Sequence, residues 1–218
     1  MSPGGQRRIS ESTVRRLSVY LRFLRELTRQ GRELVSSRQL ARGCGTTPAQ
    51  VRKDLSLFGS FGKRGRGYTV DELRRTLEGI LGLGRRWRVA LVGVGKIGSA
   101  LLGYQDFARR GFDIAAAFDS DPAKAGQVVS GVRVYSAERL TEVVRMQHIE
   151  LGIIATPPES AQTVADELVG AGVGAILNFA PVEIDVPDSV TVRTMDVALE
   201  LEGLSFVLTS GDRMPSRE

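Results

Sequence analysis

Three glycines and one aspartate carry the strongest chemical signal in the sequence. Gly93, Gly95 and Gly98 form the pattern GxGxxG directly after an apolar run. The first glycine of this pattern allows a tight turn, the second lets a pyrophosphate approach the backbone, and the third lets a helix lie close to a strand. Asp119 follows at the offset of about 20 residues where an acid can bond both hydroxyls of an adenosine ribose. The pattern predicts a site for NAD(H) rather than NADP(H), because the carboxylate repels a 2′-phosphate.

The residues around these glycines predict the elements that hold the site. Arg88 to Val92 predict a buried strand, Lys96 to about Arg109 a helix, and Phe112 to Phe118 a second strand that ends at Asp119. The N-terminus of the helix would point at the phosphates, where its dipole favours negative charge. Asp121 is expected to start the next turn rather than to bind the cofactor. The phosphate-loop contacts expected from the pattern are Gly93, Val94, Gly95, Lys96, Ile97 and Gly98.

Strands and helices keep alternating further along the chain. The segments ELGIIATPP, GAILNFAPV and VTVRT predict strands, and ESAQTVADELVGAG predicts a helix. This alternation predicts an α/β fold with a doubly wound parallel sheet of the Rossmann type. Ligands of such sheets bind beyond the carboxyl ends of the strands, although a proline there can also simply end a strand. The residues expected on the nicotinamide side are Thr156, Pro157, Asn178, Phe179, Ala180 and Pro181.

The charge of the chain is unevenly distributed. Residues 1–88 carry 20 Lys and Arg against 7 Asp and Glu, whereas residues 89–218 carry 10 against 18. This change of sign predicts two domains with different partners, the first of them suited to a polyanion. The alternative is a basic face that is merely solvated. Gly82 and Gly84 mark the expected junction.

The basic segment has the pattern of a winged helix-turn-helix. Apolar spacing predicts a first helix that ends at Gly31, and Ser36 or Ser37 would cap a short second helix. Thr47 and Pro48 would start a third helix. The glycine-rich basic stretch GSFGKRGRGYTV then predicts a hairpin that forms the wing. The apolar stripe of the first helix consists of Val14, Leu17, Leu21, Leu24 and Leu27.

The third helix is the expected DNA-contacting element. Val51, Leu55 and Phe58 follow one face and should pack inward. The opposite face then offers amide, guanidinium and ammonium groups, which pair with adenine, guanine and phosphate oxygens. The alternative for this half of the chain is a helical dimerisation domain. Including the wing, the expected DNA contacts are Gln50, Arg52, Lys53, Ser56, Lys63, Arg64 and Arg66.

Composition excludes several other classes of protein. No part of the chain approaches a run of roughly 18 apolar residues, so no membrane span is predicted. The N-terminus lacks the apolar core of a signal peptide, which predicts a cytoplasmic protein. The single cysteine, Cys44, excludes an internal disulfide and cannot form a structural zinc site by itself, so no metal is expected.

Residues for hydride-transfer catalysis are missing from the sequence. A dehydrogenase needs a proton donor or acceptor near the nicotinamide. The single histidine, His148, precedes a strand and so lies at the wrong edge of the sheet, and no tyrosine is followed by lysine four residues later. The sequence therefore predicts a binding protein and no enzyme. The alternatives are an oxidoreductase with a basic dimerisation domain, and a Rossmann domain that binds coenzyme A or another nucleotide.

The C-terminal segment is too short for a substrate domain. Val197, Leu201, Leu204 and Leu208 keep helical spacing, and further apolar residues widen the stripe beyond the needs of one small domain. Such a helix at the end of a chain predicts a contact with a second subunit. Packing against its own domain is the alternative.

Several stretches together resemble the Rex family of bacterial redox-sensing transcriptional repressors over nearly the whole chain. They are YLRFL, VRKDLSLFGSFGKRGRGYTV, GILG, VGVGKIGSAL with FDSDP, IATP and LNFAP. The resemblance implies a homodimer whose winged helices bind a palindromic operator and release it when NADH binds. It implies a winged-helix domain at 1–84, a Rossmann domain at 85–194, and a dimerisation helix with a tail at 195–218. The terminal helix would be domain-swapped onto the partner subunit.

Matched residue by residue, the resemblance implies further site residues. It places the recognition helix at Pro48–Phe58 and the wing at Phe61–Tyr68. Leu57 stands where the family commonly has tyrosine, and Val197 where phenylalanine is frequent, so the DNA contact and the packing beside the nicotinamide differ here. The implied switch contact between subunits consists of Arg22, Tyr104 and Asp196.

The expected switch depends on the nicotinamide ring, because NAD+ and NADH share the adenosine and the pyrophosphate. The oxidised ring is a cation that loses hydration when it is buried, whereas the reduced ring is neutral, so a dry pocket favours NADH. Phe107, Pro157 and Phe179, with Tyr104 from the resemblance, are expected around the ring. A bound neutral ring would then favour a closed dimer whose recognition helices no longer match two DNA half-sites.

Overall fold

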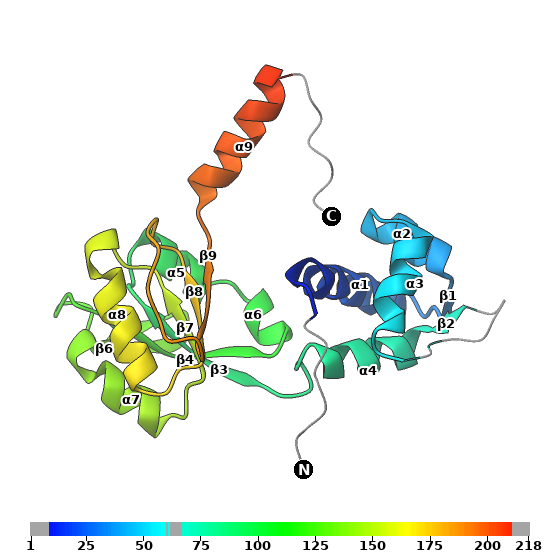
Figure 1. Ribbon diagram of the computed structural model, residues 1–218. Helices are drawn as coiled ribbons and strands as arrows, with labels where there is room; N and C mark the ends of the chain where they lie inside the picture. The colour runs from blue at the N-terminus through cyan, green and yellow to red at the C-terminus, as the bar shows by residue number, and fades with distance from the viewer. Residues whose placement is uncertain (1–8, 60, 62–66, 211–218) are drawn as a thin grey trace, which may run out of the picture. The chain divides into compact units, whose positions relative to one another are not determined.

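The computed structural model describes residues 9–59, 61 and 67–210 of the chain. The protein divides into two compact units between Gly84 and Arg85, and each unit has its own apolar core (Figure 1). Gly82, just before the boundary, has a φ of 68°, a backbone conformation that favours glycine. The glycine-rich stretch therefore ends the first unit.

The first unit is a small helical domain closed by a two-stranded antiparallel sheet, in which Val35 pairs with Tyr68. Its order of elements is that of the predicted winged helix-turn-helix, with α2 and α3 as the helix-turn-helix. Residues 62–66, most of the predicted wing, lie outside the described part of the chain. The elements are α1 (Glu11–Arg29), β1 (Leu34–Val35), α2 (Ser37–Cys44), α3 (Pro48–Ser56), β2 (Tyr68–Thr69) and α4 (Val70–Ile80).

Side-chain caps determine where α2 and α3 begin. Ser36 forms a capping box with Gln39, so Ser36 rather than its neighbour is the N-cap of α2. The hydroxyl of Thr47 accepts a hydrogen bond from the N–H of Gln50, and Pro48 lies in the first turn of α3. Both helix starts predicted from these residue types are confirmed.

The core of the first unit differs from the predicted stripe near the start of α1. Leu17 and Leu24 are fully buried as predicted, but Val14 is 42% exposed. Tyr20, which the predicted stripe did not include, is completely buried, and its hydroxyl donates a hydrogen bond to Asp54. The expectation for Val14 is therefore wrong, because its neighbour Thr13, which is 6% exposed, lies on the buried side of α1 instead.

The second unit is built on a seven-stranded sheet with the order β5-β6-β4-β3-β7-β8-β9. Every pair in it is parallel except the antiparallel pair of β5 and β6. From β6 to β9 the order is that of a Rossmann sheet, which confirms the predicted doubly wound fold and puts its switch point between β3 and β7. The strands are β3 (Trp87–Val92), β4 (Phe112–Asp119), β5 (Val128–Val129), β6 (Val132–Ser136), β7 (Leu151–Ile154), β8 (Ala175–Asn178) and β9 (Thr191–Thr194).

Apolar clusters cover both faces of this sheet. Ala90 and Val92 of β3 belong to the cluster on the side of α7 and α8, whereas Val89 and Leu91 pack with Leu102 of α5 on the other side. The sheet is thus the middle layer of three, and its loops are held between two packed faces. The helices are α5 (Lys96–Leu102), α6 (Asp106–Arg109), α7 (Leu140–Met146) and α8 (Pro158–Gly170), and a 3-10 turn (Ala137–Arg139) precedes α7.

The single helix predicted over residues 96–109 is wrong, because α5 and α6 are separate helices. α5 stops before Gly103, a residue that is unfavourable inside helices, and α6 follows after a short turn. The break leaves Tyr104 52% exposed. Its ring lies edge-on to the ring of Phe107, with the two centroids 5.0 Å apart.

The last described helix, α9 (Val197–Ser210), has no buried residue. The predicted apolar stripe is present on this helix, but its own unit does not bury it. None of the described helices has both the length and the apolarity that crossing a membrane requires. The apolar side chains that are at least 60% exposed are Val197, Leu199, Leu201, Leu204, Phe206 and Leu208.

Candidate functional site

The glycine pattern forms the loop between β3 and α5, beside the switch point of the sheet. Gly93 has a φ of 96°, and a Cβ there would lie 2.5 Å from the carbonyl oxygen of Ala155. A Cβ on Gly98 would overlap the carbonyl oxygen of Gly93. Gly95, by contrast, has open space where its Cβ would be. Two glycines thus serve the fold, and the third leaves the backbone open to a ligand, as a pyrophosphate requires.

Asp119 ends β4 next to this loop and is only 9% exposed. Its Oδ2 accepts hydrogen bonds from the N–H of Val94 at 2.8 Å and from Nζ of Lys124 at 2.9 Å. Its Oδ1 accepts one from the N–H of Asp121 at 2.9 Å. Burial alone would raise the pKa of this carboxyl, but these hydrogen bonds bring it below its usual value. Asp119 is therefore ionised at neutral pH, and one of its roughly four acceptor positions remains open.

Lys124 is a site residue that the sequence did not predict. Asp121 starts a turn, as predicted, because its Oδ1 accepts a hydrogen bond from the N–H of Ala123 at 2.9 Å. This turn brings the ammonium group of Lys124 back to Asp119. A lysine five residues after the acid was the only signal in the sequence. The ammonium offsets part of the charge that would repel a 2′-phosphate, so the discrimination expected from Asp119 alone is weakened.

The loops after β7 and β8 form the opposite side of the candidate site. Thr156 follows β7, and its buried Oγ1 has no hydrogen-bond partner among the described residues. A buried hydroxyl without a partner is costly, which suits it to a polar group of a ligand. Phe179 follows β8 and is half-buried, whereas Pro157 and Pro181 are exposed. At the first turn of α5, Lys96 and Ile97 are also exposed.

Two residues predicted on the nicotinamide side are used by their own loop instead. Asn178 is completely buried, and its Nδ2 donates hydrogen bonds to the carbonyl oxygens of Ala180 at 3.1 Å and Val182 at 2.8 Å. Its Oδ1 accepts a hydrogen bond from the N–H of Ala180, which is itself 1% exposed. Both N–H groups of the amide are engaged, so we correct the expected role of Asn178 and Ala180 from ligand contact to shaping the loop.

The predicted recognition helix, α3, has the two faces that its sequence predicts. Val51 and Leu55 are buried, and Phe58 packs half-buried at the edge of the same core. On the opposite face Arg52, Lys53, Ser56 and Leu57 are exposed. The exposed face therefore offers two cations and a hydroxyl, and at Leu57 an apolar side chain.

Gln50 departs from this division. It is half-buried, and its Nε2 donates a hydrogen bond of 2.8 Å to Oδ1 of Asp54, a residue only 1% exposed. Arg52 keeps a 3.2 Å hydrogen bond to the hydroxyl of Ser37 on α2. The predicted wing contacts Lys63, Arg64 and Arg66 lie outside the described residues.

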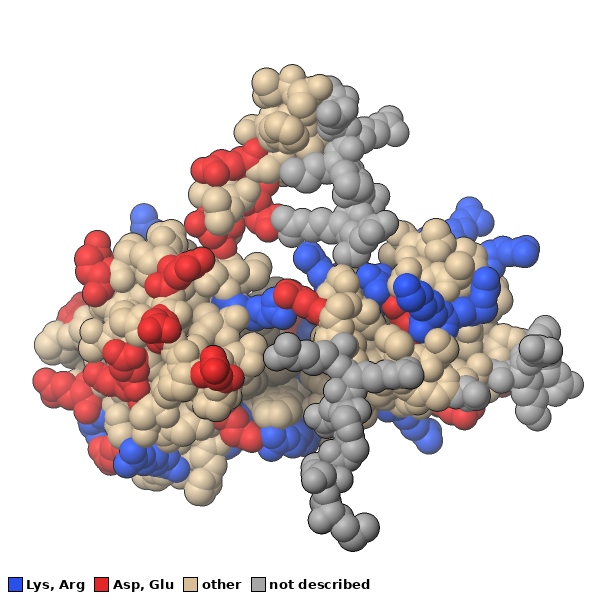
Figure 2. Space-filling view, in the orientation of Figure 1, with Lys and Arg blue, Asp and Glu red and all other residues tan. Residues whose placement is uncertain are grey.

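The uneven charge of the sequence is visible on the molecular surface. Figure 2 shows Lys and Arg side chains gathered over the unit of α1 to α4, whereas Asp and Glu are frequent over the sheet unit. A basic surface around α2 and α3 attracts phosphate, which adds sequence-independent affinity for nucleic acid. The first unit is thus electrostatically suited to DNA.

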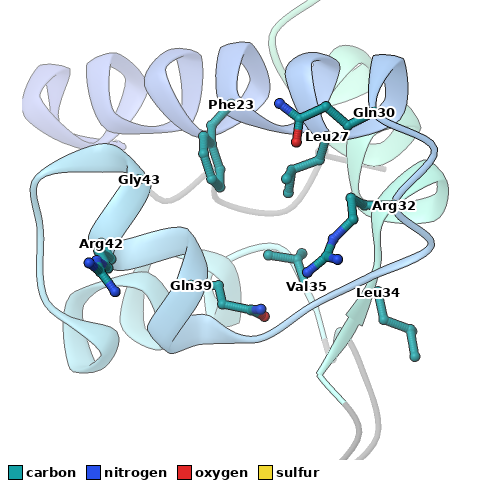
Figure 3. A pocket seen from close by; sticks show the side chains of 9 residues that line it. All are labelled: Phe23, Leu27, Gln30, Arg32, Leu34, Val35, Gln39, Arg42 and Gly43. Carbon is teal, nitrogen blue, oxygen red and sulfur yellow. The ribbon is translucent and has the colours of Figure 1, made fainter.

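A cavity of about 600 Å³ lies between α1 and α2 in the first unit (Figure 3). Phe23 and Leu27 of α1 contribute apolar side chains to its lining, and Arg32, Gln39 and Arg42 contribute polar ones. All of its lining residues belong to the first unit, so this cavity is separate from the glycine loop. Its lining includes no residue of the glycine pattern.

The three residues of the implied switch lie on different elements. Arg22 is exposed on α1, and Tyr104 is exposed between α5 and α6. Asp196 precedes α9, and its Oδ1 accepts hydrogen bonds from the N–H groups of Ala198 at 2.8 Å and Leu199 at 3.3 Å. Asp196 thus caps α9. The implied contact joins residues of two subunits.

Two family models match the chain, one in each unit. A model for a DNA-binding protein N-terminus matches residues 8–56, and the CoA binding domain matches residues 85–182. The two matches fall on opposite sides of the boundary at Gly84 and Arg85. They agree with the predicted order of a DNA-binding domain followed by a nucleotide-binding Rossmann domain.

Curated relatives are similar to nearly the whole chain. A redox-sensing transcriptional repressor Rex from Desulfitobacterium hafniense is 50% identical over 199 residues, which are 91% of this chain and 95% of the relative. A protein of the same name from Carboxydothermus hydrogenoformans is 50% identical over 199 residues, with 91% and 96% covered. Another from Syntrophobacter fumaroxidans is 44% identical over 205 residues, with 94% and 98% covered.

Solved structures of RSP, a Rex-family repressor, are similar as well. Its complex with beta-NAD+ and operator DNA matches with a TM-score of 0.90 and 35% identity, over 94% of this chain and 95% of that chain. Its complex with beta-NADH matches with a TM-score of 0.83 and 34% identity, over 94% and 97%. These relatives are transcriptional repressors rather than dehydrogenases.

Proposed function

The chain belongs to the Rex family of redox-sensing transcriptional repressors, and we propose that it binds operator DNA and leaves it when NADH binds. It is a regulator and not an enzyme. The observation that carries the proposal is the presence of two chemically distinct sites on two units: the exposed basic face of α3, and the open glycine loop beside Asp119. Acting on DNA, the protein works in the cytoplasm.

On the DNA side, α3 enters the major groove. Arg52 and Lys53 contact guanine edges or phosphates, and Ser56 contacts a base or a phosphate oxygen. Leu57 supplies an apolar contact, suited to a thymine methyl group or a sugar. Lys63, Arg64 and Arg66 extend the contact as the wing. Because phosphate contacts dominate affinity, binding weakens steeply as salt rises.

On the cofactor side, the residues of the site fit a dinucleotide. Gly95 leaves room for a pyrophosphate at the start of α5, and the ionised Asp119 has an acceptor position for a ribose hydroxyl. The free hydroxyl of Thr156 would bond the nicotinamide carboxamide. The proposed contacts are Gly93, Val94, Gly95, Lys96, Ile97, Gly98, Tyr104, Phe107, Asp119, Thr156, Pro157, Phe179 and Pro181.

Selectivity for the reduced cofactor comes from the nicotinamide side. Phe107, Pro157 and Phe179 are apolar and would lie around the ring. Burying the charged ring of NAD+ there costs more than burying the neutral ring of NADH. NADH must bind the DNA-free form about 5.5 kcal/mol better than the DNA-bound form to invert an equilibrium from 1:99 to 99:1.

The active form is a homodimer held by α9. A helix with no buried residue cannot be stable in water by itself, because isolated helices of this length are marginal. A second subunit of the same chain is the partner that a symmetric operator requires. In this dimer α9 is exchanged between subunits, and Asp196, Arg22 and Tyr104 form the contact that senses the cofactor.

A DNA-release titration tests the proposal. Fluorescence anisotropy of a palindromic duplex, selected from a randomised pool by the full-length protein, would be followed while NADH, NAD+, NADPH or coenzyme A is added. We expect NADH to release the duplex at a concentration at least about ten times lower than NAD+. Equal potency of NADH and NAD+ contradicts redox sensing. Release by coenzyme A alone would instead support a coenzyme A sensor.

A further inference from the structure

Asp54 is a buried charge in the middle of the recognition helix. Its Oδ2 accepts hydrogen bonds from Nε of Arg16 at 2.7 Å and from the hydroxyl of Tyr20 at 2.9 Å. Its Oδ1 accepts them from Nη2 of Arg16 and from Nε2 of Gln50, both at 2.8 Å. A carboxylate has about four acceptor positions, so Asp54 is saturated. Burial alone would raise its pKa, but the bonds from Arg16, Gln50 and Tyr20 lower it, and Asp54 is ionised.

This saturated carboxylate determines which end of the Gln50 amide points outward. A glutamine amide is broadly free to rotate about its last torsion, and a half-turn exchanges its oxygen with its nitrogen. An ionised carboxylate can only accept hydrogen bonds, so Asp54 can hold only the Nε2 end. Gln50 and Asp54 are four residues apart on one helix and are therefore neighbours. The Oε1 of Gln50 accepts no hydrogen bond from a described residue and remains available as an acceptor.

We infer that Asp54 is a positioning residue for base recognition: it fixes the Gln50 amide so that α3 reads adenine and rejects guanine at one base pair. This inference rests on the proposed function, in which α3 enters the major groove. Adenine presents its N6 amino group as a donor and N7 as an acceptor, and thus matches Oε1 and the second hydrogen of Nε2. Guanine presents the acceptor O6 in place of the N6 amino group, so O6 and the fixed Oε1 would face each other as two acceptors without a hydrogen between them.

Replacing Asp54 with asparagine should change this preference rather than only weaken binding. At the Oδ2 position the new side chain faces Nε of Arg16 and the hydroxyl of Tyr20, so its oxygen takes that position. Its nitrogen takes the Oδ1 position, where the hydrogen bond from Nη2 of Arg16 is lost. Its nitrogen then faces Gln50 and holds Oε1 inward. The Nε2 of Gln50 becomes the outward group, a donor that suits guanine.

The test compares full-length variants on one set of duplexes. The duplex is the palindrome selected by the unaltered protein, with each base pair of a half-site changed in turn, at one fixed salt concentration. We expect the unaltered protein to prefer adenine over guanine at one position by roughly 5- to 100-fold. Asp54→Asn should abolish or reverse that preference while preferences at other positions persist. Gln50→Ala should abolish it, and the double variant should behave as Gln50→Ala alone.

A control and a direct measurement separate positioning from a folding effect. Asp71→Asn removes an aspartate of the same unit that is 55% exposed and pairs with Arg74, and it should leave every preference unchanged. In the unaltered protein, one hydrogen of the Gln50 side-chain amide should exchange with water more slowly than those of the exposed Gln105. Nuclear magnetic resonance measures this exchange, and it does not require the Asp54 variant to fold.

Three results would decide against the inference. The first is full adenine preference in Asp54→Asn alongside its loss in Gln50→Ala. The second is an equal loss of affinity for all duplexes in Asp54→Asn, since that indicates a purely structural role. The third is fast exchange of both Gln50 amide hydrogens. If the unaltered protein selects no duplex at all, the proposed function fails instead, and slow amide exchange would still show that Asp54 orients Gln50.

Discussion

Each unit of the protein contains a buried aspartate, and the two differ in what is left for a partner. Asp54 is 1% exposed and takes hydrogen bonds only from side chains, which fill all of its acceptor positions. Asp119 is 9% exposed and takes two of its three bonds from backbone N–H groups. In both, hydrogen bonds outweigh burial and lower the pKa of the carboxyl. The saturated carboxylate holds protein elements together, and the unsaturated one remains available to a ligand.

The largest difference should appear in stability. Asp54→Ala removes one partner of a buried ion pair and should lower the free energy of unfolding of the first unit by about 3 kcal/mol. Asp119→Ala should cost the second unit only about 1 kcal/mol, because its donors include a lysine near solvent. The single tryptophan, Trp87, lies in the second unit, so its fluorescence follows that unit during denaturation. A shift of the tryptophan transition in Asp54→Ala would contradict this expectation, because it would mean that Asp54 stabilises the second unit as well.

Cofactor affinity should depend on Asp119, in contrast to stability, which should depend mainly on Asp54. Asp119→Ala removes a charged acceptor for the ribose, and the Kd for NADH should rise roughly 10- to 100-fold. DNA binding without cofactor should be unchanged, and calorimetry with anisotropy measures the two. Asp121→Ala is the matched control, since Asp121 bonds the N–H of Ala123 in its turn and should have a much smaller effect. Loss of both cofactor and DNA binding in Asp119→Ala would indicate misfolding.

Lowering the pH should remove the contribution of the ionised Asp54 to the stability of the first unit. The pKa of Asp54 is lowered by folding, so its contribution to stability is complete above the unfolded carboxyl pKa of about 3.9 and is lost as the pH falls toward the folded value. The first unit should lose stability below about pH 4, by at most about 1.4 kcal/mol per pH unit from this group. In Asp54→Asn this part of the slope disappears. Denaturant unfolding followed by circular dichroism measures it, and an unchanged slope would contradict the assignment.

The smallest expected effect concerns Lys124. Its ammonium is 2.9 Å from Oδ2 of Asp119 and has 35% of its side chain exposed, so the pair contributes little. Lys124→Met should increase the preference for NADH over NADPH by about 2- to 5-fold, because the carboxylate then repels a 2′-phosphate without an offsetting cation. Competitive titration with the two cofactors measures the ratio. A decrease in the preference would mean that Lys124 itself rejects the phosphate.

Local patterns in the sequence predicted local structure well. The glycine spacing with Asp119 predicts the phosphate loop, and Thr47 with Pro48 predicts the start of α3, because each depends on neighbours within a few residues or on one strand–helix–strand unit. The elements β5, β6 and α7 were not predicted. The strands β5 and β6 are too short and too mixed in composition to show a hydrophobic period.

Long-range contacts could not be predicted from the same patterns. A polar residue such as Asp54 within a helix ordinarily faces solvent, and its donors Arg16 and Tyr20 lie on another helix far along the chain. Gln50 was therefore assigned to the exposed face, although its amide donates a hydrogen bond to the buried Asp54. Asn178 was placed correctly at a strand end, but its burial depends on the path of the following loop.

The ion pair of Arg16 and Asp54, with the hydroxyl of Tyr20, ties α1 and α3 into one stiff block. Arg22 lies on the same α1, so a force applied there turns the whole block. Gly82 ends this unit with a φ of 68°, and nothing nearby would obstruct a Cβ at Gly84. In the proposed dimer, each block would therefore keep its shape when its position changes.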